Sequence, residues 1–171
     1  LAPPQEYPRL VSKLMNKIAP HNVNEVYFTC GCYTSANENA IKLATLHKFY
    51  ELKGTDKLTP EEEISVMMGN APGAPAFAVI VIQGGLHGTS LSTMSASSCE
   101  HLDINHFVRF NWPTAPFPQI KYPYEEHEAM NRKEEERCIA QTEQLIKDTL
   151  KTKPIDAMII EPIQYGVQYA S

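Results

Sequence analysis

The segment CGCYTSANENA, residues 30–40, places two cysteines, a glycine and small hydroxylated residues ahead of a helix-like sequence. A glycine turn that leads into a helix leaves free amide donors and the positive end of the helix dipole facing outward, so this segment could bind a phosphate. Alternatively, Ser35 or Asn37 simply caps the helix, and the spacing alone favours this cap. A metal site is disfavoured, because no second cysteine or histidine pair stands at suitable spacing from Cys30 and Cys32.

Two further loops carry polar residues directly after apolar runs. GGLHGTS, residues 84–90, places His87 among three glycines, which allow the backbone to approach a ligand closely. A tight turn with a hydrogen-bonded histidine explains the same pattern equally well. Glu161 and Gln164 follow the apolar AMII, and the carboxylate either faces solvent or points into a cleft.

Alternating strands and helices must position these loops. Apolar periodicity and capping residues predict helices at 5–18, 37–53, from Thr59-Pro60 onward, and 124–150. We expect strands at 23–29, 76–83, 106–110 and 155–162, and a short helix through Ser97. The run at 76–83 is apolar on both faces, as in a buried parallel strand. The four prolines between 111 and 124 predict an extended, ordered segment.

This alternation predicts an α/β fold with a mostly parallel sheet flanked by helices. In such sheets ligands bind at the carboxyl ends of the strands, which here lead into residues 30–36, 84–90 and 161–169. Residues 1–171 show no internal boundary and are expected to form one domain.

Composition narrows the function classes. The 171 residues carry a net charge of −5, which argues against a nucleic-acid or anionic-membrane surface. No apolar run approaches the roughly 20 residues that span a bilayer, and the first ten residues lack signal-peptide character. Four irregularly spaced cysteines indicate reduced thiols rather than a disulfide framework.

Several motifs occur in a familiar order: ANENAIK, APGAP, HG, WPTAPFPQIKYP, EEERC and IIEPIQ. Together they resemble the 4-aminobutyrate aminotransferases, a branch of the class III pyridoxal-phosphate (PLP) transaminases. The resemblance implies part of the large domain of the fold-type I enzymes. It also implies cofactor-binding roles, with Gly31, Cys32 or Ser35 at the phosphate, His87 beside the cofactor, and Glu161 with Gln164 at the reaction centre.

Departures from the family pattern gather at the same loops. The phosphate turn is two residues longer, and Cys-x-Cys replaces the Cys-x-x-Cys with which some members bind an iron–sulfur cluster. Leu86 replaces the phenylalanine that stacks on the pyridine ring, and Thr89 replaces the arginine that binds the substrate carboxylate. The acidic residues after EPIQ are missing from YGVQYAS.

The resemblance places the Schiff-base lysine beyond these residues. We therefore expect no catalytic residue, no metal and no PLP on this chain, and no activity of the chain alone. The favoured hypothesis is an inactive accessory subunit, bound to other protein chains of a mitochondrial assembly in the matrix or on the matrix side of an inner-membrane complex. The alternative is the N-terminal part of an active PLP-dependent 4-aminobutyrate (ω-amino acid) transaminase, with its lysine on another segment or chain.

Overall fold

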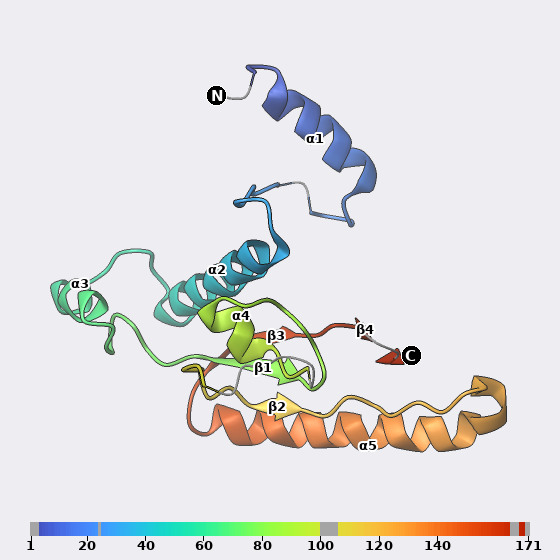
Figure 1. Cartoon of the computed structure of the whole chain (residues 1–171). Helices are drawn as coiled ribbons and strands as arrows, with labels where there is room; N and C mark the ends of the chain where they lie inside the picture. Colours follow the sequence, from blue (N-terminus) through green and yellow to red (C-terminus); the bar gives the residue numbers. More distant parts are fainter. Residues whose placement is uncertain (1–3, 24, 100–105, 165–167, 170–171) are drawn as a thin grey trace. The chain divides into compact units, whose positions relative to one another are not determined.

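The computed structural model describes residues 4–23, 25–99, 106–164 and 168–169. The chain forms two compact units, Leu1–Cys32 and Tyr33–Ser171 (Figure 1). Among the described residues no helix is long and apolar enough to cross a membrane.

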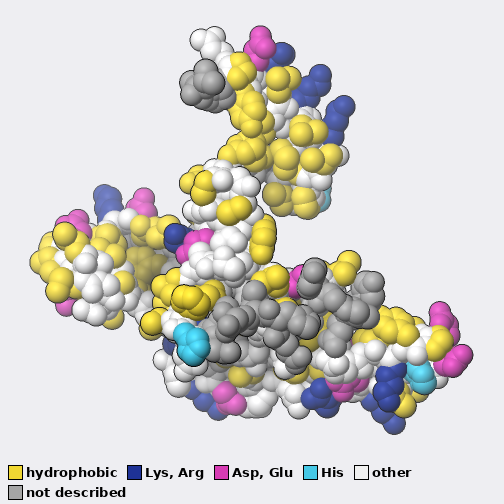
Figure 2. Space-filling model, viewed as in Figure 1, with side chains coloured by type: hydrophobic (Ala, Val, Ile, Leu, Met, Phe, Trp, Pro, Cys, Tyr) yellow, Lys and Arg dark blue, Asp and Glu magenta, His cyan; other side chains and the backbone are white. Residues whose placement is uncertain are grey.

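The first unit is built on helix α1, Tyr7–Ile18, which confirms the helix predicted from apolar periodicity. Its row of Leu10, Leu14 and Ile18 is exposed, and Figure 2 shows hydrophobic side chains gathered on this unit. The strand predicted at 23–29 is wrong, because its described residues form no strand. A strand requires a hydrogen-bonded neighbour, and within the described part of the chain no strand pairs with this segment.

The second unit contains a parallel three-stranded sheet (Figure 1). Strand β1, Ala78–Ile82, lies between β2, Thr114–Ala115, and β3, Ile155–Ile159, and pairs in parallel with both. All five residues of β1 are buried, which confirms the prediction of a parallel strand covered on both faces. Strand β4, Ile163–Gln164, pairs antiparallel with β5, Gln168–Tyr169.

Helices cover both faces of this sheet (Figure 1). Helices α2, Tyr33–Lys53, and α4, Leu91–Ala96, lie over one face, and α5, Tyr124–Leu150, over the other. Successive residues of β1 point to opposite faces. One core therefore contains Val79 and Val81 with Ile41 and Ala96, and the other contains Ile80 and Ile82 with Ala115 and Phe117. This arrangement confirms the α/β prediction.

Helix α2 begins at Tyr33, four residues before the predicted start. The expectation that Ser35 or Asn37 caps the helix is wrong, because both lie inside α2; the Glu38 carboxylate accepts a hydrogen bond from the Ser90 hydroxyl. The predicted end is confirmed: Gly54 has a φ of 72° and donates to the Tyr50 carbonyl at 2.8 Å. Helix α3, Pro60–Met67, begins with the predicted capping box of Thr59 and Glu62.

The strand predicted at 106–110 is also wrong, because α4 holds this segment. The Phe110 amide donates to the Ser95 hydroxyl at 2.8 Å. The third strand is instead β2, inside the proline-rich segment. There the Val81 amide donates to the Pro113 carbonyl at 3.0 Å and the Gln83 amide to the Ala115 carbonyl at 2.9 Å. Proline lacks an amide hydrogen, but its carbonyl still accepts.

Asp156 on β3 gives the second unit a pH-dependent stability. Its Oδ2 accepts from the Thr45 hydroxyl of α2, whereas its buried Oδ1 has no partner among the described residues. Burial raises the pKa of Asp156, and the hydrogen bond from Thr45 only partly opposes this rise. The folded state therefore favours the protonated form. Protonation of Asp156 therefore stabilises the fold. This stabilisation is fully present below the pKa that Asp156 has in the unfolded state, and it is lost as pH rises through its pKa in the folded state.

We expect Asp156→Asn to remove this dependence, because the amide stays neutral while its oxygen can still accept from Thr45. Urea unfolding across pH 3–7 checks this. At pH 7 the variant should unfold at a higher urea concentration than the wild type, and the difference between their unfolding midpoints should shrink as pH falls. A constant difference across that range would contradict it. Asp148→Asn is the exposed control, and its carboxyl has a lowered pKa, so it should not show this trend.

Candidate functional site

Two loops meet at the carboxyl edge of the sheet, where β1 and β3 end. The Leu86 amide donates to Glu161 Oε2 at 2.7 Å, and Gln164 Nε2 donates to the Gln83 carbonyl at 2.6 Å. Gly84 has a φ of 88°, and a Cβ there would collide with the Gln164 amide group. The residues between 83 and 86 are thus bound directly to the segment that follows β3.

The backbone of His87 is fixed at both of its polar groups. Its amide donates to the Ser97 hydroxyl at 2.9 Å, and its carbonyl accepts from Asn37 Nδ2 of α2 at 2.9 Å. Ser97 is completely buried, and its hydroxyl donates in turn to the Thr93 carbonyl at 2.7 Å. The loop is therefore held between α2 and α4 rather than by its own turn geometry.

The imidazole of His87 is only 5% exposed, and its Nε2 has no hydrogen-bond partner among the described residues. Gly85 makes room for the ring, since a Cβ there would lie 2.5 Å from Nε2. Burial lowers the pKa of His87, and the charge of Glu161 opposes this effect. The imidazole is therefore neutral at pH 7. A buried ring nitrogen without a partner is chemically available to a ligand.

The first turn of α2 lies beside this loop. A Cβ on Gly88 would lie 2.6 Å from Thr34 Oγ1 and 2.7 Å from Thr93 Oγ1, so only a glycine allows the loop to approach α2 this closely. Backbone amides in the first turn of a helix have no intrahelical acceptor. Ser35 belongs to this turn and is half-buried.

The structure thus brings His87, Glu161 and Gln164 together through hydrogen bonds of their loops, with Ser35 in the adjoining helix turn. Gly31 and Cys32 belong to the first unit, where both are exposed and Gly31 has a φ of 85°. Sequence reasoning missed Ser97 and the contact of Asn37 with His87. Hydroxyl side chains that follow α4 in the run SASS are the only signal that could have indicated the role of Ser97.

The loop at residues 84–90 supplies no cationic side chain of its own to the site; Lys42 of α2 is paired with Glu38, which binds Ser90 of the loop. Residues 84–90 contain no lysine or arginine, and Thr89 is exposed. Arg109, which follows α4 in the chain, donates from Nη2 to the Ser97 carbonyl at 2.5 Å and to the Met94 carbonyl at 3.1 Å. Its guanidinium is engaged at the end of α4. Among the described residues no group of three or more histidine, cysteine or acidic side chains could hold a metal ion.

A sequence model of the family described as Aminotransferase class-III matches residues 2–168. The chain belongs to this family. The 4-aminobutyrate aminotransferase of Dictyostelium discoideum is 36% identical over 99% of the chain and 34% of the relative. Its counterpart in Schizosaccharomyces pombe is 40% identical over 95% and 34%. The human protein, named 4-aminobutyrate aminotransferase, mitochondrial, is 32% identical over 96% and 33%. The chain thus spans about a third of the length of these relatives.

Solved structures confirm the fold. The structure titled lysine aminotransferase from M. tuberculosis in the internal aldimine form superposes with a TM-score of 0.69, at 20% identity, over 95% of this chain and 33% of that one. The N328A mutant of M. tuberculosis Rv3290c gives the same TM-score at 20% identity. The expected resemblance and the α/β architecture are therefore both correct.

Proposed function

We propose that this class III chain serves as a structural or accessory member of a larger assembly and does not itself carry out 4-aminobutyrate transamination. One observation carries the proposal: the loop at residues 84–90 contains no lysine or arginine. A small amino acid with a free carboxylate needs a cationic partner, and a bidentate guanidinium is the strongest one that proteins provide. The resemblance places Thr89 where the family has its arginine, and Arg109 is bound to backbone carbonyls.

Glu161 supports the same proposal. In the family this glutamate faces the reaction centre, whereas here one of its oxygens accepts from the Leu86 amide. A carboxylate that joins two loops stabilises the scaffold. Glu38, the other carboxylate near this loop, is bound to Ser90. Both acidic groups are thus engaged in holding the fold together.

The residues fit PLP on two of its sides. The first turn of α2 would hold the phosphate through its backbone amides, and buried His87 would hold the cofactor through its unpartnered Nε2. Leu86 could cover the ring without offering a π face. When bound, PLP supplies an electron sink for the carbon next to the substrate amine. The substrate side lacks its cation, so we propose that the pocket is vestigial and that no PLP is held covalently on this chain.

The second candidate is the N-terminal part of an active PLP-dependent 4-aminobutyrate transaminase. The unpartnered Nε2 of His87 favours it, because a buried nitrogen of this kind is more readily retained where a ligand uses it.

A mitochondrial location is proposed because the pig, human and mouse relatives are named mitochondrial. Partner chains are proposed because Met158 and Ile163 are at least 48% exposed.

Borohydride reduction of the native assembly, followed by peptide mass spectrometry of every polypeptide in it, separates the two candidates. Reduction fixes PLP to the lysine that holds it. We expect no pyridoxyl-lysine, with the chain recovered in a large complex. A pyridoxyl-lysine on this polypeptide, or on a partner recovered with it in equal amounts, together with 4-aminobutyrate-dependent amino transfer, would overturn the structural role.

A further inference from the structure

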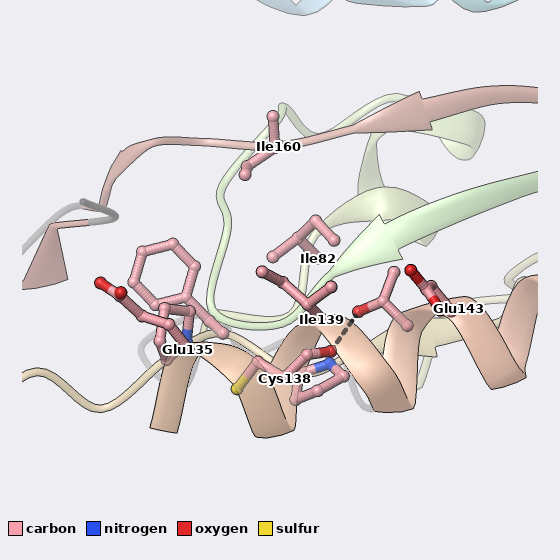
Figure 3. A pocket seen from close by; sticks show the side chains of 10 residues that line it. Ile82, Glu135, Cys138, Ile139, Glu143 and Ile160 are labelled. Carbon is pink, nitrogen blue, oxygen red and sulfur yellow. Dashed lines mark hydrogen bonds between the residues drawn. The ribbon is translucent and has the colours of Figure 1, made fainter. Parts of the chain in front are cut away.

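A cavity lies on the α5 face of the sheet and shares no residue with the His87 site (Figure 3). It has a volume of about 290 Å³ and lies between α5, the end of β1 and the proline-rich segment. Its wall combines four large apolar side chains with a glutamate toward each end: Ile82, Phe117, Ile139 and Ile160, with Glu135 and Glu143. We call it the α5 groove.

Glu135 is the unusual residue in the α5 groove. Its Oε1 is buried and has no hydrogen-bond partner among the described residues. Its acidic neighbours on α5 are paired, Glu134 with Arg137 at 2.6 Å and Glu136 with Arg132 at 3.6 Å. A buried carboxylate oxygen without a donor is unfavourable unless a cation or donor reaches it. The groove thus presents a carboxylate that lacks its counterpart.

The other residues that line the groove favour contact with an apolar part of a ligand over a second polar contact. Ile139 and Ile160 are each at least half exposed, so they line an accessible surface. The Thr142 hydroxyl donates to the Cys138 carbonyl at 2.8 Å (Figure 3) and is already engaged. Burial raises the pKa of the Cys138 thiol, which keeps it neutral. Because Glu143 is paired with Lys147 at 3.9 Å, the unpaired charge in the groove comes from Glu135.

We propose that the α5 groove binds a small linear aliphatic amine, with its ammonium group on Glu135 and its alkyl chain along Ile139 and Ile82. Glu143 lies eight residues further along α5, about 12 Å at the rise of an α-helix, and is paired with Lys147 at 3.9 Å, so the proposed ligand needs only one cationic end. The cavity is at the lower limit of small-molecule pockets, which span about 300–1,000 Å³, so it suits an unbranched ligand better than a protein surface.

Calorimetric titration of the full chain tests the proposal with three probes of equal length: hexylamine, 1-hexanol and hexanoate. We expect hexylamine to bind at least about tenfold more tightly than hexanol, since a hydrogen bond to a charged group contributes about 1.5–3 kcal/mol. Hexanoate should not bind. Nα-acetyl-lysine amide should bind no better than hexylamine; tighter binding would assign the groove to a partner's lysine and overturn the small-ligand proposal.

Matched variants locate the binding. Glu135→Gln keeps the shape of the side chain and should weaken hexylamine at least about tenfold. Glu128→Gln removes the same charge from an exposed position on the same helix and should leave binding unchanged. Ile139→Trp changes an exposed residue and should abolish binding by filling the groove. Absent hexylamine binding, equal affinity for hexanol, or unchanged affinity in Glu135→Gln would each overturn the proposal.

Discussion

Gly88→Ala is expected to lower the free energy of unfolding by about 3 kcal/mol, since a strained backbone and a crowded side chain each contribute about 1–3 kcal/mol. Gly88 has a φ of 132°, which L side chains rarely adopt. The new Cβ would lie 2.6 Å from Thr34 Oγ1 and 2.7 Å from Thr93 Oγ1. Both threonines are β-branched and stiff at χ1, and Thr93 is completely buried, so neither can turn away easily. The substitution therefore forces α2 and the His87 loop apart.

Urea unfolding measures the loss, and hydrogen exchange of the amides in the first turn of α2 locates it. Gly69→Ala is the matched control: Gly69 also has a positive φ, of 68°, but a Cβ there meets nothing within 4 Å. It should lose only about 1 kcal/mol, from the backbone alone. Equal losses in the two variants would contradict the crowding at Gly88 and, with it, the close approach of the loop to α2.

The elements that the sequence predicts correctly are those with local causes. The capping box of Thr59 and Glu62 sets the start of α3, and Gly54 ends α2. The apolar spacing of α1 and the doubly apolar run of β1 also carry their own signal. Each of these features depends on residues within about two helical turns, so one sequence window contains the whole reason.

The wrong predictions concern contacts between distant residues. Residues 23–29 have strand composition, but a strand forms only where another strand offers hydrogen bonds. Strand β2 was missed because prolines flank it, yet the Pro113 carbonyl pairs with the Val81 amide across 32 positions of sequence. The start of α2 was misplaced because the helix begins at Tyr33, ahead of the expected caps, and Glu38 accepts from Ser90, 52 residues away. Tertiary contacts override local preference in each case.

The same contrast between local causes and contacts of distant residues applies to the candidate site. The rule that ligands bind at the carboxyl ends of parallel strands directed attention to His87 and Glu161, and the structure joins their loops. No sequence pattern indicates that Ser97 and Asn37 hold the two backbone groups of His87, because these bonds span 10 and 50 residues. The unpartnered Nε2 is a consequence of burial, which single-sequence patterns do not report.

Asn131→Ala is expected to lower the free energy of unfolding by about 2 kcal/mol, the combined effect of two lost part-buried hydrogen bonds at about 1 kcal/mol each. Asn131 of α5 is 1% exposed. Its Nδ2 donates to the Lys121 carbonyl at 2.9 Å, and its Oδ1 accepts from the Lys121 amide at 2.8 Å. One amide side chain thus mimics a strand neighbour and fixes the proline-rich segment to α5.

Urea unfolding with hydrogen exchange at the Lys121 amide checks this clamp. Asn131→Asp should keep the acceptor for that amide but lose the donor to the carbonyl, so Lys121 stays protected while roughly half of the destabilisation remains. Asn111→Ala removes an exposed asparagine and should change stability by less than about 0.5 kcal/mol. If Lys121 exchanged equally slowly in wild type and Asn131→Ala, the clamp would not be what holds this segment, and packing of Phe117 in the α5-side core would have to do so.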